Sequence, residues 1–189
     1  MPVRLERWTA KEMRPRLDEV IGVYADAMGY PRGLATARRA TFAEHTERSD
    51  YLAVAALEGP ALVGIGYGYR SAPGQWWHEQ VRRAAERIDT AAMIWLSDAF
   101  EIAELHVVPT WQGQGIGRSL LADLPARSTH ERVLLSTPEG PTRAWSLYRS
   151  VGFVDVLRHH HFPGDGRPFA ILGLERPGHN HLRPGDPHA

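Results

Sequence analysis

A glycine-rich turn at residues 112–118 is the part of the sequence whose spacing most directly suggests chemistry. It reads Gln-Gly-Gln-Gly-Ile-Gly-Arg, with glycine at positions 113, 115 and 117. A β-rich run ends before it at Pro109, and a helical pattern follows from about Ile116. Because the first N–H groups of a helix have no intrahelical acceptor and lie at the positive end of its dipole, the turn predicts a site for a phosphate or pyrophosphate.

Two common nucleotide-binding motifs do not fit this turn. A P-loop needs Gly-Lys-Ser/Thr at the helix start, whereas the chain has Gly117, Arg118 and Ser119 at a different spacing. The dinucleotide fingerprint G-x-G-x-x-G, begun at Gly113, requires a glycine where Arg118 stands. A tight turn whose glycines serve packing alone is the structural alternative.

A third motif, Gln/Arg-x-x-Gly-x-Gly/Ala, is matched by Gln112, Gly115 and Gly117. About thirty residues further on, the segment 144–153 contains Leu147-Tyr148 followed by Gly152-Phe153. In this order the two segments resemble the acetyl-CoA motif and a later helix of the GNAT superfamily of N-acetyltransferases. The resemblance covers about residues 99–158 in detail.

The resemblance implies the GNAT fold, an α/β (α+β) arrangement. Its central sheet is mixed and mostly antiparallel, has about six or seven strands, splays at the cofactor site and carries helices on both faces. We expect one domain over residues 1–176, with an insert at 71–99. Residues 177–189 are rich in Pro, Gly and polar residues, which predicts a flexible tail.

Hydrophobic periodicity and turn residues predict the individual elements. Strands are expected over residues 3–8, 51–57, 61–69, 100–108, 132–136, 153–158 and 169–175. Helices are expected over residues 10–28, 34–45, 75–88, 116–124 and 141–151. The glycines at 64, 66 and 68 indicate a strand that bends or lets a ligand approach closely.

Acetyl-CoA is the co-substrate that the resemblance implies. The backbone of residues 105–107 would pair with the pantetheine arm, and the turn from Gly113 to Arg118 would hold the pyrophosphate. The expected cofactor-binding residues are Leu105, His106, Val107, Gln112, Gly113, Gln114, Gly115, Ile116, Gly117, Arg118 and Tyr148. Some relatives have glutamate at the position of Ser136 and asparagine at that of Pro141, so those two roles are not transferred.

Tyr148 matches a family tyrosine that lies near the cofactor sulfur and protonates the departing thiolate. A phenol with a pKa of about 10 is a competent acid for a thiolate whose pKa is about 8 to 9. The attacking amine must also lose a proton, and Glu104 is the expected general base, with Glu101 and His106 as alternatives. The structural alternatives are a tyrosine packed for its ring and strand residues that face solvent or form a salt bridge.

The insert at 71–99 is the expected cover of the acceptor site. Its aromatic side chains Trp76, Trp77 and Trp95, together with Glu101, are the predicted substrate-binding residues. They favour a small-molecule primary amine, acetylated by direct transfer in a ternary complex, although the tryptophans would serve equally to pack the insert. The alternatives are a peptide or protein N-acetyltransferase and a non-catalytic acyl-CoA-binding regulator on the same fold.

Composition excludes several other classes of protein. The 22 basic and 22 acidic residues give no basic excess for nucleic-acid or membrane-surface binding. No cysteine is present, which excludes disulfides, thiolate metal sites and a cysteine acyl intermediate. The histidines at 159–161 and in the tail lack converging spacing, so no metal site is expected. Without a signal peptide or an apolar span, we expect a cytoplasmic protein, and the family suggests a homodimer.

Overall fold

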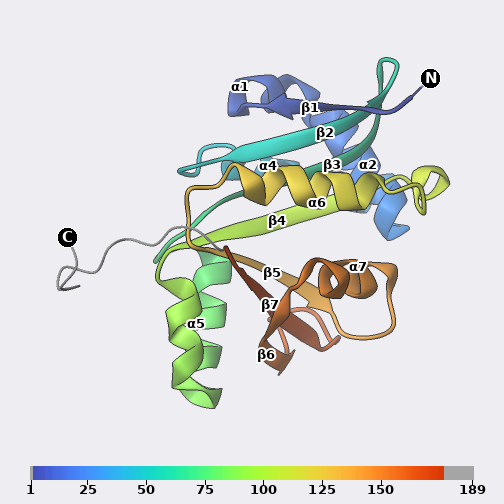
Figure 1. Cartoon of the computed structure of the whole chain (residues 1–189). Coiled ribbons are helices and arrows are strands. Elements are labelled where there is room, and N and C mark those ends of the chain that lie inside the picture. Colours follow the sequence, from blue (N-terminus) through green and yellow to red (C-terminus); the bar gives the residue numbers. More distant parts are fainter. Residues whose placement is uncertain (1, 177–189) are drawn as a thin grey trace, which may run out of the picture.

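Seven strands form a single sheet in the computed structural model, which describes residues 2–176 (Figure 1). In spatial order they are β1 (Arg4–Trp8), β2 (Leu52–Glu58), β3 (Ala61–Ser71), β4 (Ala99–Val107), β5 (Arg132–Pro138), β7 (Phe169–Glu175) and β6 (Val154–His160). All neighbours are antiparallel except β4 and β5, which run parallel. The mixed, mostly antiparallel sheet confirms the predicted fold class. The predicted tail, residues 177–189, lies outside the described part of the chain.

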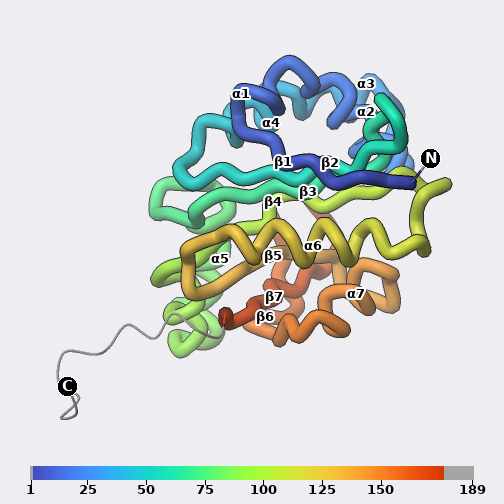
Figure 2. Tube along the Cα trace, turned by 45° about the horizontal axis from the view of Figure 1, so that its top comes forward, coloured from blue at the N-terminus to red at the C-terminus, as the bar shows by residue number. Residues whose placement is uncertain are grey.

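Helices cover both faces of this sheet (Figures 1 and 2). They are α1 (Ala10–Met13), α2 (Leu17–Met28), α3 (Arg32–Thr36), α4 (Arg39–His45), α5 (Trp76–Ile88), α6 (Ile116–Ala126) and α7 (Arg143–Val151), with 3-10 turns η1 (Arg14–Arg16), η2 (Thr90–Leu96) and η3 (Pro109–Trp111). Because strand side chains alternate, Val54 packs with α6 and α7 on the front face, whereas Ala55 packs with α2 and α4 on the rear face. Leu134 of β5 packs with α5, which places α5 on the rear face as well.

Three predicted helices are divided or extended at a proline or a short turn, and a fourth, predicted over 141–151, begins two residues later at Arg143, after its N-cap Thr142. The predicted helix over 10–28 is divided by η1, because Pro15 has no N–H to donate to the preceding turn. The predicted helix over 34–45 consists of the two short helices α3 and α4. By contrast, α6 continues through Pro125 to Ala126, since a proline in the last turn removes only one backbone hydrogen bond.

The glycines of β3 allow close backbone and helix packing. A Cβ at Gly68 would lie 2.1 Å from the carbonyl oxygen of Glu101, and one at Gly66 would lie 2.9 Å from Leu105 Cδ1. These glycines therefore allow β4 to pack closely against β3. The sequence had suggested either a bend in the strand or the close approach of a ligand.

Candidate active site

The sheet opens between its two parallel strands. Pairing of β4 with β5 is confined to Ala99–Glu101 and Arg132–Leu134, and beyond these residues the strands diverge (Figure 1). Two cavities meet at this opening, a front cavity of about 680 Å³ beside α6 and α7 and a rear cavity of about 720 Å³ on the other face. The residues that line both are Leu105, Val107, Gln112, Ala144 and Tyr148. The opening therefore connects the two faces of the sheet.

The glycine turn forms one wall of the front cavity. Gly113 has φ +78° and Gly115 has φ +84°, left-handed values that favour glycine, and a Cβ at either position would meet no atom within 4 Å. The first backbone hydrogen bond at the start of α6 runs from Ser119 N–H to the Gly115 carbonyl at 3.0 Å. The earlier N–H groups of the helix are therefore free of intrahelical acceptors and lie beside open space, which fits a pyrophosphate group.

Side chains hold this turn against β4 and α7. The Gln112 side chain donates from Nε2 to the Val107 carbonyl at 2.9 Å, which fixes the first motif residue to the end of β4. Arg118 donates to Ser150 Oγ of α7 at 2.8 Å. Gly117 faces Leu147, whose Cδ2 would lie 3.4 Å from a Cβ at that position. The motif residues thus fix the conformation of the turn and also the distance between the turn and α7 across the front cavity.

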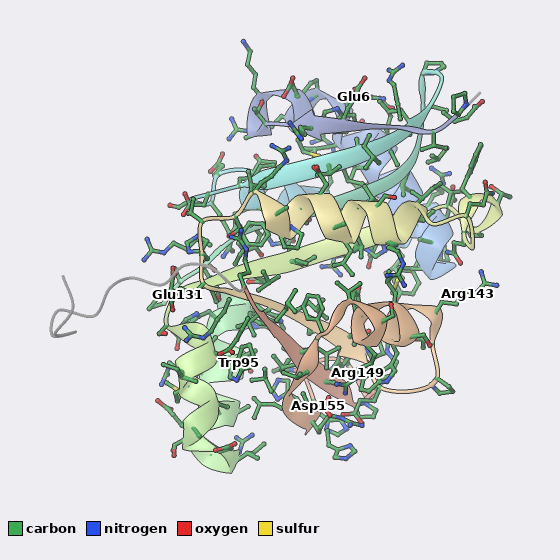
Figure 3. The ribbon with its side chains drawn as sticks, viewed as in Figure 1. Glu6, Trp95, Glu131, Arg143, Arg149 and Asp155 are labelled. Atoms are coloured by element: carbon green, nitrogen blue, oxygen red, sulfur yellow. The ribbon has the colours of Figure 1, made fainter. Side chains whose placement is uncertain are left out.

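The start of α7 forms the opposite wall. Thr142 caps this helix by accepting a hydrogen bond from Trp145 N–H at 3.1 Å, and Arg143 lies at its outer end (Figure 3). The lining residues that sequence analysis missed are Pro141, Thr142, Arg143, Ala144, Ser146, Leu147 and Ser150. The Thr142 cap marked a helix start, but only the tertiary arrangement shows that this start faces the glycine turn.

The rear cavity lies between a charged wall and an aromatic wall. Helices α2 and α4 and the residues between and after them supply Tyr24, Arg38, Glu44, His45 and Arg48 to the first wall. Helix α5, β7 and the segment between β6 and β7 supply Trp76, Trp77, Phe162 and Phe169 to the second. Part of β4 forms the floor between them.

A β-bulge brings three titratable side chains of β4 to this floor. Tyr67 of β3 pairs with Glu104, but the next residue, Gly68, pairs with Ile102, so Ala103 is the extra residue. Regular alternation would place residues 101 and 104 on opposite faces of the strand. With the bulge, Glu101, Glu104 and His106 all line the rear cavity, which the sequence spacing alone did not predict.

Glu104 is the centre of a polar network. Its Oε2 lies 2.5 Å from Nε2 of His106, and its Oε1 lies 3.5 Å from an Nη of Arg38. Arg38 also donates to the Tyr24 hydroxyl at 3.1 Å. The Tyr24 ring packs edge-on against His106, with ring centroids 5.2 Å apart. These contacts hold the Glu104 carboxylate in one orientation at the floor of the cavity.

Glu101 has a different environment, because it is buried and nearly unpaired. The Tyr69 hydroxyl donates to its Oε1 at 3.4 Å, and its Oε2 has no hydrogen-bond partner. Burial raises the pKa of the Glu101 carboxyl to about 8, against the opposing charge of Arg48. Glu101 therefore carries its proton through most of the neutral pH range.

Tyr148 of α7 is buried at the junction of the two cavities. Burial raises the pKa of its phenol, and the negative charge of Glu104 raises it further. The phenol is therefore protonated at neutral pH. Its ring packs against Phe153, with centroids 5.8 Å apart.

The insert divides into residues that reach the rear cavity and residues that do not. Trp76 and Trp77 line it, and the Trp77 indole donates to Ser136 Oγ of β5 at 3.1 Å. Trp95, which sequence analysis grouped with them, packs instead on β7 beside Gly173 (Figure 3). Sequence spacing could not separate these tryptophans, because all three lie in one insert.

Two features are absent from residues 2–176, a membrane-spanning helix and a metal-binding cluster. In this range no helix is long and apolar enough to cross a bilayer. The same residues include no cluster of three or more His, Asp or Glu side chains arranged to hold a metal ion.

Comparison with known proteins agrees with this geometry. A family model described as an acetyltransferase (GNAT) domain matches residues 74–155. The chain is 40% identical over 196 aligned positions to the GCN5-like protein acetyltransferase Rv2170 of Mycobacterium tuberculosis, covering 88% of this chain and 94% of that protein.

Solved structures share the fold at low sequence identity. The ribosomal-protein-S18-alanine N-acetyltransferase of Escherichia coli superposes with a TM-score of 0.64 at 18% identity, covering 95% of this chain and 98% of that one. The PaiA N-acetyltransferase of Thermoplasma acidophilum, solved with coenzyme A, gives 0.62 at 14% identity, covering 93% and 100%. The chain therefore belongs to the GNAT family of acetyltransferases, with acetyl-CoA as its co-substrate.

Proposed function

We propose that this protein transfers an acetyl group from acetyl-CoA to a primary amine by direct attack in a ternary complex. The observation that carries the proposal is the meeting of the two cavities at Tyr148, with Glu104 on the floor of the rear one. In this arrangement the thioester reaches the opening from the front and the amine from the rear. The amine nitrogen bonds to the acetyl carbon, and the bond from that carbon to sulfur breaks.

The front cavity supplies the cofactor-binding residues of the proposal. The N–H groups from Gly113 to Arg118 bind the pyrophosphate, and Gln112 keeps the turn attached to β4 through its 2.9 Å hydrogen bond to Val107. The backbone of residues 105–107 has no β5 partner along this stretch, so its groups on that side can pair with the pantetheine arm, apart from the Val107 carbonyl, which already accepts from Gln112.

Glu104 is the proposed general base. It is held by His106 and Arg38, and its charge acts on the pKa of Tyr148, so the two groups are electrostatically coupled across the opening. Glu104 accepts the ammonium proton, and the 2.5 Å contact with His106 holds the carboxylate in place for that step. Glu101 is the weaker candidate base because its carboxyl is already protonated at neutral pH.

Tyr148 is the proposed general acid, which donates its phenolic proton to the departing thiolate. The raised pKa keeps that proton on the tyrosine until the carbon–sulfur bond breaks. Its position at the junction of the cavities supports this role, whereas a tyrosine needed only for packing would not have to line both.

The preferred acceptor is a small-molecule amine, supported by the aromatic wall and the acidic floor of the rear cavity. A protein amine is the second candidate, because the Mycobacterium tuberculosis relative is named a protein acetyltransferase. A panel of small amines, polyamines, amino acids and lysine-containing peptides, assayed by release of coenzyme A, separates the two.

The roles are tested with Glu104→Gln, compared with the control Glu47→Gln. Glu47 carries the same chemical change on a side chain that is 70% exposed and pairs with Arg14 at 3.5 Å. Glu104→Gln is expected to lower kcat by about 10²-fold or more and to leave the Kd of acetyl-CoA within about twofold of wild type. Normal kcat in Glu104→Gln would refute its role as the base. Binding of acetyl-CoA without turnover of any acceptor would instead favour a regulator.

A further inference from the structure

Aromatic rings in edge-to-face and tilted contact form a continuous cluster at the aromatic wall of the rear cavity. The Phe162 ring lies 4.5 Å from His160 and 5.2 Å from Phe169 between ring centroids, and it is buried. Trp76, at the start of α5, lies 5.5 Å from Phe162 with its plane tilted by 33°. The inner rings thus give Trp76 a fixed support on one side.

Trp76 itself is 54% exposed, although it lines the rear cavity. Single exposed apolar residues are common, and Ile88 at the far end of the same helix is 58% exposed without lining either cavity. Trp76 differs from Ile88 because it combines three features: a position on the cavity wall, a buried aromatic support and a large free ring surface.

The charges that line the rest of the cavity are largely matched with one another. Arg38 lies against Glu104, Arg48 donates to Glu44 at 2.9 Å, and Arg167 forms a two-pronged pair with Asp165. A nonpolar part of an acceptor would strip water from these ion pairs if it lay against them. The aromatic wall is a surface of the cavity where such a part is accommodated without that cost.

We propose that Trp76, supported by Phe162, binds a planar or aromatic group of the acceptor, so that the enzyme prefers amines that carry such a group. The inference rests on the proposed function, because that function places the reacting amine beside Glu104. The planar group belongs either to a small molecule or to a residue beside an acetylated lysine, since both present the same chemistry to the indole ring.

The test compares matched acceptors in wild type and in Trp76→Ala. The small-molecule pair is 2-phenylethylamine and n-butylamine, and the peptide pair is a lysine flanked by phenylalanine and a lysine flanked by alanine. Wild type is expected to prefer the aromatic member of one pair by about tenfold in kcat/KM, chiefly through KM. Trp76→Ala is expected to lose this preference, because kcat/KM falls about tenfold further for the aromatic member than for the other member. Trp76→Phe is expected to retain most of it.

Ile88→Ala is the matched control, because it truncates an equally exposed apolar side chain on the same helix outside the cavity. Binding of the same amines and peptides to the coenzyme A complex is also measured by calorimetry, which needs no turnover. If none of these amines and peptides is acetylated, the proposed function is refuted. Calorimetry would still show whether the aromatic site binds planar groups. Equal binding of both members of each pair to wild type, or an equal loss for both in Trp76→Ala, would overturn the inference.

Discussion

Replacing Glu101 by Gln tests the electrostatics of the rear cavity floor. Burial raises the pKa of this carboxyl from its ordinary value of 4.5 to about 8. Between these two pH values the unfolded chain releases the Glu101 proton, whereas the folded protein retains it. Because the unfolded state then binds fewer protons, the free energy of unfolding falls as the pH rises.

The size of the effect follows from the two pKa values. Below pH 4.5 Glu101 is protonated in both states and does not alter stability. The difference between 4.5 and about 8 corresponds to about 5 kcal/mol, reached above pH 8, and to about 3 kcal/mol at pH 7. Gln is neutral at every pH and nearly the same shape, so Glu101→Gln should be about 3 kcal/mol more stable than wild type at pH 7 and nearly equal to it at pH 4.

Urea unfolding from pH 4 to pH 9, followed by tryptophan fluorescence, measures this difference. The exposed variant Glu47→Gln is the control and should follow wild type at every pH. A stability difference that does not change with pH, or a Glu101→Gln variant less stable than wild type at pH 7, would show that burial does not raise the pKa of Glu101. If Glu101 also contacts the acceptor, the stabilised variant should have a raised KM for the amine and an unchanged Kd for acetyl-CoA.

Three further substitutions test the junction, the turn and the bulge. Tyr148→Phe keeps the ring packing on Phe153 and should lower kcat by about 10²-fold in rapid-mixing assays, with the Kd of acetyl-CoA within about twofold of wild type; unchanged kcat would contradict the acid role. Gly115→Ala places a side chain at φ +84° and should weaken acetyl-CoA binding about tenfold by calorimetry; unchanged affinity would show that this turn does not bind the cofactor. Gly68→Ala puts a Cβ 2.1 Å from the Glu101 carbonyl oxygen and should cost about 3 kcal/mol of stability in urea unfolding; wild-type stability would show that the bulge adapts.

The sequence was most informative where local chemistry decides the structure. The glycine turn before Ile116 and the helix that ends at Gly152 follow from backbone rules, and the structure has them where the pattern predicts. The break at Pro15 follows from the same rules, but the helical periodicity of residues 10–28 led to the prediction of one continuous helix.

Contacts between distant segments were beyond the reach of the sequence. The extra residue at Ala103 depends on its pairing with β3, so the shared face of the three β4 side chains was not predictable. Trp76 and Trp95 belong to the same insert, yet one lines a cavity and the other packs on Gly173. Only the fold of the insert separates them.

Whether the protein is an acetyl-CoA-dependent acetyltransferase is tested by titrating it with acetyl-CoA in a calorimeter and by assaying coenzyme A release with the amine panel. We expect one acetyl-CoA site per chain, lost or weakened in Gly115→Ala, and amine-dependent release of coenzyme A that Glu104→Gln and Tyr148→Phe both slow. If the wild-type protein did not bind acetyl-CoA, its assignment as an acetyl-CoA-dependent enzyme would be wrong.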